Sequence, residues 1–212
     1  MVYKIILASS SPRRQQLMQA AGIQFEVRSK EVEEIYPSGL EVKDIPLYLA
    51  KLKAEAFKKE QAENELLITA DTIVCIHHKK VGKPRDRADA IRILEELSGN
   101  KHTVITGLCL TTSSEQRCFS VSTDVCFRTL TREEIEFYID VYKPYDKAGA
   151  YGIQEWIGYI GIERIEGSFY NVMGLPVQTL YTELKKLGIT FLPKSSSVQK
   201  KETDGIEPFV NL

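Results

Sequence analysis

The sequence ASSSPRR, Ala8 to Arg14, joins an apolar run typical of a β-strand to a run typical of an α-helix. A strand, a small polar loop and a helix start commonly bind phosphate, because free N–H groups of the first helical turn point at the anion and the helix dipole favours negative charge there. Ser11 is placed as the N-cap of this helix, and Pro12 as its first residue. The stretch therefore predicts a strand–loop–helix unit that binds an anion.

Two arginines and the serine hydroxyls strengthen this prediction. Arg13 and Arg14 carry planar, permanently charged guanidinium groups that match phosphate oxygens, and Ser9 and Ser11 offer hydroxyl groups. A capped helix with two arginines on its surface fits the same residues. On this motif alone the two interpretations remain open.

Strand-like and helix-like runs alternate along the rest of the chain, which predicts an α/β fold with a mixed sheet. The expected strands are residues 2–7, 25–27, 65–70, 72–76, 103–111 and 119–127. The expected helices are residues 12–21, 44–64 and 87–98, one that starts after the N-cap Thr131, and one that ends before Gly188. Because the chain is polar and serine-rich from residue 194 onward, we expect one domain over residues 1–193 and a flexible tail over 194–212.

The composition is that of one globular domain. The chain has 212 residues, of which 43% are hydrophobic, enough for a substantial core. Its 28 Lys and Arg residues nearly balance 29 Asp and Glu residues, and the net charge of −1 argues against a nucleic-acid partner but allows a small anionic ligand. No run approaches the ~20 apolar residues of a membrane span. Met1 begins directly on a strand-like run, so we expect no signal peptide, no membrane contact and a cytoplasmic location.

The cysteines and histidines show no spacing typical of a metal site. We expect all four cysteines to be reduced and to pack as small hydrophobic residues: Cys75, Cys109, Cys118 and Cys126. His77 and His78 fall in an expected hairpin turn beside two lysines, and we expect them, like His102, to be solvated.

Lys53 lies on the apolar face of the helix expected over residues 44–64. At ~100° per residue, Lys53 falls within the arc that contains Leu49 and Phe57, whereas Lys51 falls opposite. A lysine on a buried face must find a partner or extend to solvent at the flank of the helix. Lys53 is therefore either a snorkelling residue or a cation that points into a cleft.

Three further charged residues are candidates for such a cleft. Asp71 interrupts the apolar run ITADTIVCI, where aspartate is unfavourable within a strand. At the end of a strand it could bind a divalent metal or accept a proton from water, whereas a turn aspartate would bond its own backbone. Glu34 and Lys83 lie in expected loops, where solvated charge is the common alternative.

Residues 143–174 contain six of the 13 glycines, a density typical of functional loops inside a domain. Two runs stand out there, DKAGAYGIQ at 146–154 and GSFYNVMGLP at 167–176. Gln154 can donate and accept hydrogen bonds, which suits the edge of a nucleobase. A series of plain β-turns is the alternative.

These runs, in this order and spacing, resemble the Maf family of nucleoside triphosphate pyrophosphatases. The similarity extends from about residue 4 to residue 188 and comprises ASSSPRR, ADT at 70–72, GKPRD at 82–86, DKAGAYGIQ and GSFYNVMGLP. It implies an elongated α/β fold of the inosine-triphosphatase type, in which helices flank a mixed sheet and a cleft separates two lobes. It also implies a cytoplasmic enzyme with a divalent cation, Mg²⁺ or Mn²⁺, and often a homodimer. Phe169 departs from the usual tyrosine of the family.

The resemblance implies roles for single residues. Asp71 matches the proton acceptor of the family, and with Glu34 it is the expected metal ligand. The expected catalytic residues are Asp71, Glu34, Lys53 and Lys83. The expected substrate-binding residues are Ser9, Ser11, Arg13, Arg14, Thr72 and Gln154. The combination of Arg13, Thr72 and Gln154 resembles the branch that acts on dTTP and UTP.

Hydrolysis of dTTP or UTP at the α-phosphorus, to the monophosphate and pyrophosphate, is therefore the expected function. The family was historically called septum formation inhibitors, so one alternative is a catalytically silent nucleotide-binding regulator of cell division. Another is a nucleic-acid-binding module, against which the near-zero net charge and the lack of a basic stripe argue.

Overall fold

The structure, a computed structural model, describes residues 3–189 and 191, and the predicted tail over 194–212 lies outside them. In this part of the chain, seven strands form one sheet in the order β2-β1-β3-β5-β6-β7, with β4 paired to β3. The strand β1 (Lys4–Ala8) is parallel to its neighbours β2 (Glu26–Arg28) and β3 (Glu65–Ile76), and the other pairs are antiparallel. The predicted α/β fold with a mixed sheet is confirmed.

The remaining elements follow the expected order. The other strands are β4 (Lys79–Val81), β5 (Lys101–Thr111), β6 (Gln116–Phe127) and β7 (Ile162–Glu166). The α-helices are α1 (Pro12–Ala20), α2 (Ile45–Glu55), α3 (Arg87–Leu97), α4 (Arg132–Tyr142), α5 (Trp156–Gly161), α6 (Phe169–Val172) and α7 (Val177–Lys186), with short 3₁₀ helices at Val42–Asp44 and Ala148–Ala150. No helix of the described residues is long and apolar enough to span a membrane.

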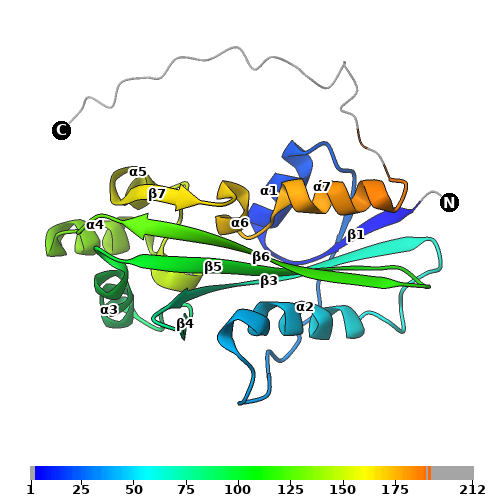
Figure 1. Ribbon diagram of the computed structural model, residues 1–212, viewed down its shortest axis with the longest axis horizontal. Helices are drawn as coiled ribbons and strands as arrows, with labels where there is room; N and C mark the ends of the chain where they lie inside the picture. The colour runs from blue at the N-terminus through cyan, green and yellow to red at the C-terminus, as the bar shows by residue number, and fades with distance from the viewer. Residues whose placement is uncertain (1–2, 190, 192–212) are drawn as a thin grey trace, which may run out of the picture.

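Helices cover both faces of the elongated sheet. Figure 1 shows α1, α6 and α7 on one face and α2 on the other. Successive side chains of a strand point to opposite faces, and β1 follows this rule. Ile5 and Leu7 belong to the cluster that contains Leu17 of α1, whereas Ile6 packs with Ala54 of α2. The fold thus places α1 and α2 on opposite faces of the sheet, at the strands β1 and β3.

The helix predicted over residues 44–64 is shorter than expected, because α2 ends at Glu55. Residues after it form tight turns, with Phe57 N–H donating to Ala54 O at 3.0 Å. Phe57 is 4% exposed and packs with Ile6 of β1. The Nζ of Lys30 donates to the carbonyl of Ala56 at 2.9 Å. Burial of Phe57 and this cation at the last turn account for the early end of the helix.

The prediction of two short strands separated by Asp71 is wrong. The strand β3 runs without interruption through Asp71, which lies opposite Gly107 of β5. The predicted hairpin turn after β3 is confirmed, with His77 and His78 at positive φ. An aspartate is tolerated within β3 because its carboxylate has a charged partner on α2.

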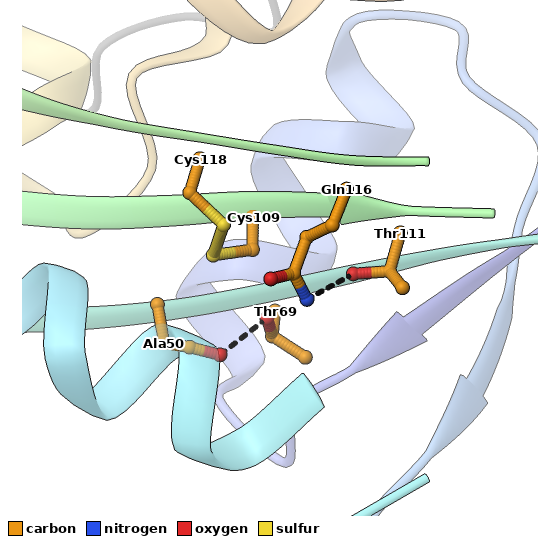
Figure 2. The surroundings of a disulfide bond; sticks show 6 residues. All are labelled: Ala50, Thr69, Cys109, Thr111, Gln116 and Cys118. Carbon is orange, nitrogen blue, oxygen red and sulfur yellow. Dashed lines mark hydrogen bonds between the residues drawn. A yellow bond between two sulfur atoms is a disulfide. The ribbon is translucent and has the colours of Figure 1, made fainter. Parts of the chain in front are cut away.

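The expectation that all four cysteines are reduced is wrong for one pair. Cys109 of β5 and Cys118 of β6 lie directly opposite each other and form a disulfide, with their Cα atoms 4.2 Å apart. Figure 2 shows this disulfide near the contact of β3 with α2, where Thr69 Oγ1 donates to Ala50 O at 2.7 Å. The register of β5 and β6 brings the sulfur atoms together, and this register is set by long-range pairing. Cys75 is a free cysteine.

The expectation that His102 is solvated is also wrong. His102 is 1% exposed, and its Nε2 lies 2.8 Å from the Oη of Tyr151. The ring also makes edge contacts with Phe127 and Tyr151. The sequence analysis placed His102 outside the strand, whereas β5 begins at Lys101 and directs this side chain into the core.

Candidate active site

Along one of its edges, the middle of β3 has no neighbouring strand among the described residues. The last pair of β3 with β1 is Ile68 with Leu7, and the first pair with β4 is Val74 with Val81. Between these pairs, residues 69–73 have a strand neighbour only on the β5 side in the part of the chain that the structure describes. The alternation of side chains directs Asp71 toward α2 and Thr72 toward α1.

A cavity of about 1100 Å³ lies at this part of β3. The loop after β1 borders it on one side and residues 146–148 and 151–155 on the other. Every site residue that the sequence selected lines this cavity: Ser9, Ser11, Arg13, Arg14, Glu34, Lys53, Asp71, Thr72, Lys83 and Gln154. The fold therefore collects residues from six separate parts of the sequence around one hollow.

Lys53 of α2 joins two carboxylates at the floor of the cavity. Its Nζ lies 2.6 Å from Oδ1 of Asp71 and 2.7 Å from Oε1 of Glu34. The side chains of Lys53 and Asp71 are only 20% and 11% exposed. Of the two interpretations of Lys53, the cation that points into a cleft is the correct one. Asp71 bonds this cation, so it is not a turn aspartate.

The two carboxylates that share Lys53 differ in their pKa. Burial raises the pKa of Asp71 above its usual value, and the charge and hydrogen bond of Lys53 only partly oppose this. Burial also acts to raise the pKa of Glu34, but the hydrogen bond and charge of Lys53, with the charges of Lys83 and Lys80, outweigh it and lower the pKa. Carboxylates whose pKa values are moved apart are typical of acid–base sites.

Asp71 and Glu34 are one pair of carboxylates in this cavity that could hold a divalent cation. Among the described residues, no group of three or more His, Cys, Asp or Glu side chains is placed to hold a metal ion. Mg²⁺ commonly uses one or two carboxylates, several waters and the phosphates of a substrate. Two carboxylates that converge on one point, as these do at Lys53 Nζ, suit this mode of binding.

The guanidinium group of Arg14 is bonded mainly to the protein. Its Nε donates to Gly174 O at 2.8 Å, and its Nη2 donates to Thr72 Oγ1 at 3.1 Å. Its Nη1 donates to Ala70 O at 2.9 Å and to Ser9 Oγ at 3.3 Å. These bonds use four of the five N–H groups of an arginine. Arg14 therefore fixes the loop after β1, the open edge of β3 and the segment before α7 relative to one another.

The loop after β1 presents a helix start to the cavity. Ser9 Oγ accepts a hydrogen bond from Ser11 N–H at 3.2 Å. Ser11 occupies the N-cap position as predicted, but its side chain makes no capping hydrogen bond. The N–H of Gln15 bonds Ser11 O at 3.3 Å, so the N–H groups of Arg13 and Arg14 precede the first backbone bond of α1. Such N–H groups are available to an anion.

The opening of the cavity carries exposed polar residues. Arg13, whose side chain is 33% exposed, lies with its Nη1 3.1 Å from Oδ2 of Asp146. This ion pair crosses from α1 to the segment before the 3₁₀ helix at Ala148–Ala150. Lys83 and Gln154 are exposed and line the same opening.

A family model for Maf-like proteins matches residues 4–187. The chain belongs to this family. A dTTP/UTP pyrophosphatase from Parabacteroides distasonis is 57% identical over 86% of this chain and 95% of that protein. A dTTP/UTP pyrophosphatase from Phocaeicola vulgatus is 57% identical over 87% and 96%. One from Flavobacterium johnsoniae is 49% identical over 87% and 95%.

Solved structures give a looser match to this Maf-like chain. A nucleoside-triphosphatase / dITP/XTP pyrophosphatase from Mycobacterium abscessus superposes with a TM-score of 0.39 at 15% identity, covering 87% of this chain and 95% of that chain. A TM-score of this size does not establish a common fold.

The cavity of this Maf-like protein also contains residues that the sequence analysis did not select. It is lined by Asp146, Lys147 and Glu155. Tyr138 donates a hydrogen bond to Glu155 but does not itself line the cavity. Asp146 and Lys147 belong to the run DKAGAYGIQ, so the motif itself was the signal, although Gln154 alone was selected from it. Tyr138 has no such signal, because α4 lies outside every motif.

Proposed function

We propose that this chain hydrolyses dTTP and UTP to the monophosphate and pyrophosphate, as a nucleoside triphosphate diphosphatase that removes these or modified pyrimidine nucleotides from the nucleotide pool. The observation that carries the proposal is the bridge of Lys53 between Asp71 and Glu34 on the floor of a cavity that Arg13 and Lys83 also line. The relatives named dTTP/UTP pyrophosphatase support the choice of nucleotide.

Several cationic groups would hold the triphosphate. Arg13 and Lys83 lie at the opening, Lys53 lies at the floor, and the first N–H groups of α1 face the same hollow. Fixed cations and N–H groups stabilise the charge that moves onto the leaving phosphate oxygens without any reorganisation. Their spread along the cavity suits an extended chain of phosphates.

Asp71 would act as the proton acceptor. A water molecule attacks the α-phosphorus and gives a proton to Asp71, the new P–O bond forms, and the bond from the α-phosphorus to the bridging oxygen breaks. Pyrophosphate leaves with the electron pair of that bond. The raised pKa of Asp71 moves it toward the range in which a general base works well.

Asp71 and Glu34 would also hold a divalent cation, Mg²⁺ or Mn²⁺, which when bound supplies positive charge to phosphate oxygens. Lys53 lies within 2.7 Å of both carboxylates and holds them in place. In this role Lys53 orients the carboxylates and screens their mutual repulsion before the substrate arrives.

A substrate panel tests the proposed function. Purified protein is incubated with dTTP, UTP, CTP, ATP and GTP, with Mg²⁺ or Mn²⁺ and with a chelator, and the nucleotide and phosphate products are separated. We expect UTP and dTTP to give equal amounts of monophosphate and pyrophosphate, and the chelator to stop the reaction. Nucleoside diphosphate and single phosphate as products, or no turnover of any pyrimidine nucleotide, would contradict the proposal.

The silent regulator is not favoured, because every charged residue expected in catalysis lines the cavity. A cytoplasmic location, a homodimer and the lack of nucleic-acid binding remain predictions that accompany this function. Size-exclusion chromatography with light scattering would test the dimer, and a gel-shift titration at low salt would test nucleic-acid binding.

A further inference from the structure

The residue proposed to contact the base, Gln154, lies on a turn that one phenol group fastens at both ends. The turn runs from Gly152 to Glu155, with Glu155 N–H donating to Gly152 O at 3.0 Å. The Oη of Tyr138 accepts a hydrogen bond from Gly152 N–H at 2.9 Å. The same Oη donates to Oε2 of Glu155. Ile153 and Gln154 are left at the corner of the turn.

The turn is also held by the packing of its side chains. Ile153 is 7% exposed, whereas Gln154 is exposed and lines the cavity. The first residue at the corner therefore packs in the core, and the second lies at the cavity. The carboxylate of Glu155 folds back over Gly152, where an added Cβ would lie 2.6 Å from its carboxyl carbon. Tyr138 is fully buried on α4, which gives the turn a rigid support.

A line of alternating charges connects this turn to the arginine of the opening. Lys147 Nζ lies 3.1 Å from Oε1 of Glu155 and 2.8 Å from Oδ1 of Asp146. The other oxygen of Asp146 pairs with Arg13 at 3.1 Å. The side chain of Lys147 is 11% exposed, so solvent screens its contact with Glu155 only weakly. Lys147 therefore holds one carboxylate oxygen of Glu155, and Tyr138 bonds the other.

We propose that Tyr138 and Glu155 are positioning residues that set the nucleotide preference of the cavity, because they hold the turn that places the amide of Gln154 at its opening. The inference rests on the proposed function, in which Arg13 meets the phosphates, and on the sequence-based expectation that Gln154 meets the base. Tyr138 does not line the cavity, so it acts only through the turn. Burial, and then Glu155, raise the pKa of Tyr138, so its hydroxyl stays a donor.

Tyr138→Phe tests the inference, because it removes the hydroxyl and keeps the ring. The matched control is Tyr142→Phe, the same change one turn along α4 on a ring that stacks on Tyr138 and is 37% exposed. We measure kcat and KM for UTP and ATP with each variant. For Tyr138→Phe we expect the ratio of kcat/KM for UTP over ATP to fall about tenfold, mostly through KM for UTP, as when a polar contact to substrate is misplaced. The control should keep the wild-type ratio.

A second variant and a second measurement distinguish a positioning role from structural damage. Glu155→Gln retains the size of the side chain but loses the charge that attracts Lys147, and it should lower the same ratio. Thermal unfolding of each variant reports structural damage separately. If Tyr138→Phe and Glu155→Gln lower activity on UTP and ATP by equal factors, or leave the ratio unchanged, the two residues do not set preference and the inference is overturned.

Failure of the proposed function would give a different result. A wild-type protein that binds UTP but releases no pyrophosphate would contradict the proposed reaction. Calorimetric titration with UTP and with ATP then measures the same preference as a ratio of dissociation constants. A fall of this ratio in Tyr138→Phe but not in Tyr142→Phe supports the positioning role, and equal ratios overturn it.

Discussion

The floor and the opening of the cavity are held in different ways. At the floor, Lys53, Asp71 and Arg14 are at most partly exposed, and each bonds other residues of the protein. At the opening, Arg13 has one ion pair to an exposed partner, and Gln154 is exposed. A floor fixed by several contacts can hold reacting groups within fractions of an ångström, whereas an arginine held by one exposed ion pair can adapt to a substrate.

Arg13 and Arg14 show this difference in two consecutive residues. Arg14 gives four hydrogen bonds to the protein, whereas Arg13 gives one, to Asp146. Successive residues of a helix point about 100° apart, so one side chain turns inward to β3 and the other turns to the opening. Of two adjacent arginines in one motif, one can thus stabilise the fold while the other binds the ligand.

Asp71→Asn at the floor should have the largest effect. The amide is as large as the carboxylate but cannot accept the proton of water, and loss of a general base typically costs about 10²–10⁴ in rate. We expect kcat for UTP to fall by that factor with little change in the melting temperature. Glu33→Gln is the control, because Glu33 lines the same cavity. Wild-type kcat in Asp71→Asn would show that this carboxylate is not the proton acceptor.

The buried residue His102 should make the stability of the fold depend on pH. Burial lowers the pKa of His102 to about 4, from an ordinary value of 6.5. Between these values the unfolded chain takes up a proton that the folded chain does not, so stability rises with pH there and is lost as the pH falls from 6.5 to 4. The loss for this one group is about 3 kcal/mol below pH 4.

Urea unfolding of wild type and His102→Gln at several pH values measures this loss. Glutamine does not titrate and can still bond the hydroxyl of Tyr151, which lines the cavity. We expect the wild type to lose more stability than His102→Gln between pH 6.5 and pH 4. Parallel curves for the two proteins would mean that His102 takes up its proton at the same pH in the folded and unfolded chains.

Arg14→Lys should impair both architecture and activity. A lysine has three N–H donors on one nitrogen and cannot reach the four acceptors that Arg14 bonds. Hydrogen bonds from charged groups contribute about 1.5–3 kcal/mol each, so partial loss should destabilise the fold by about 2 kcal/mol and lower kcat. The control is Arg87→Lys on the surface, where the paired hydrogen bonds of the guanidinium group to Asp140 are lost. Equal melting temperatures in the two variants would contradict the joining role of Arg14.

Most of the floor was predictable from the sequence, because local patterns specify it. The position of Lys53 on an apolar helix face and the polar break at Asp71 both indicated side chains that need a partner. The helix start at Pro12 followed from its local residues. The pairing of Lys53 with Asp71 needed the packing of α2 on β3, which no local pattern fixes.

Long-range register explains what the sequence analysis missed. Cys109 meets Cys118 only because β5 and β6 pair in one register. His102 is buried only because β5 begins before it and packs against Tyr151, which comes from a distant loop. Tyr138 supports the turn at Gln154 from another helix. Each of these depends on contacts between distant segments, whereas propensity and periodicity report on neighbours along the chain.

Asp146→Asn at the opening should have the smallest effect, and its sign is informative. Asp146 and the phosphates of a substrate compete for Arg13, and the Asp146 side chain is 62% exposed. Exposed ion pairs contribute about 0.2–1 kcal/mol, so we expect KM for UTP to fall by at most about fivefold, with kcat unchanged. The difference should shrink in high salt, because screening weakens exposed pairs most.

The control for this change is Asp140→Asn, which removes the same charge from an exposed arginine pair outside the cavity lining. If both variants lower KM equally, the effect is one of net charge and the ion pair is irrelevant. A rise of KM in Asp146→Asn alone would mean that Asp146 helps the substrate instead of competing with it. The opening would then be preorganised like the floor, because an ion pair that aids binding must hold Arg13 where the phosphates need it.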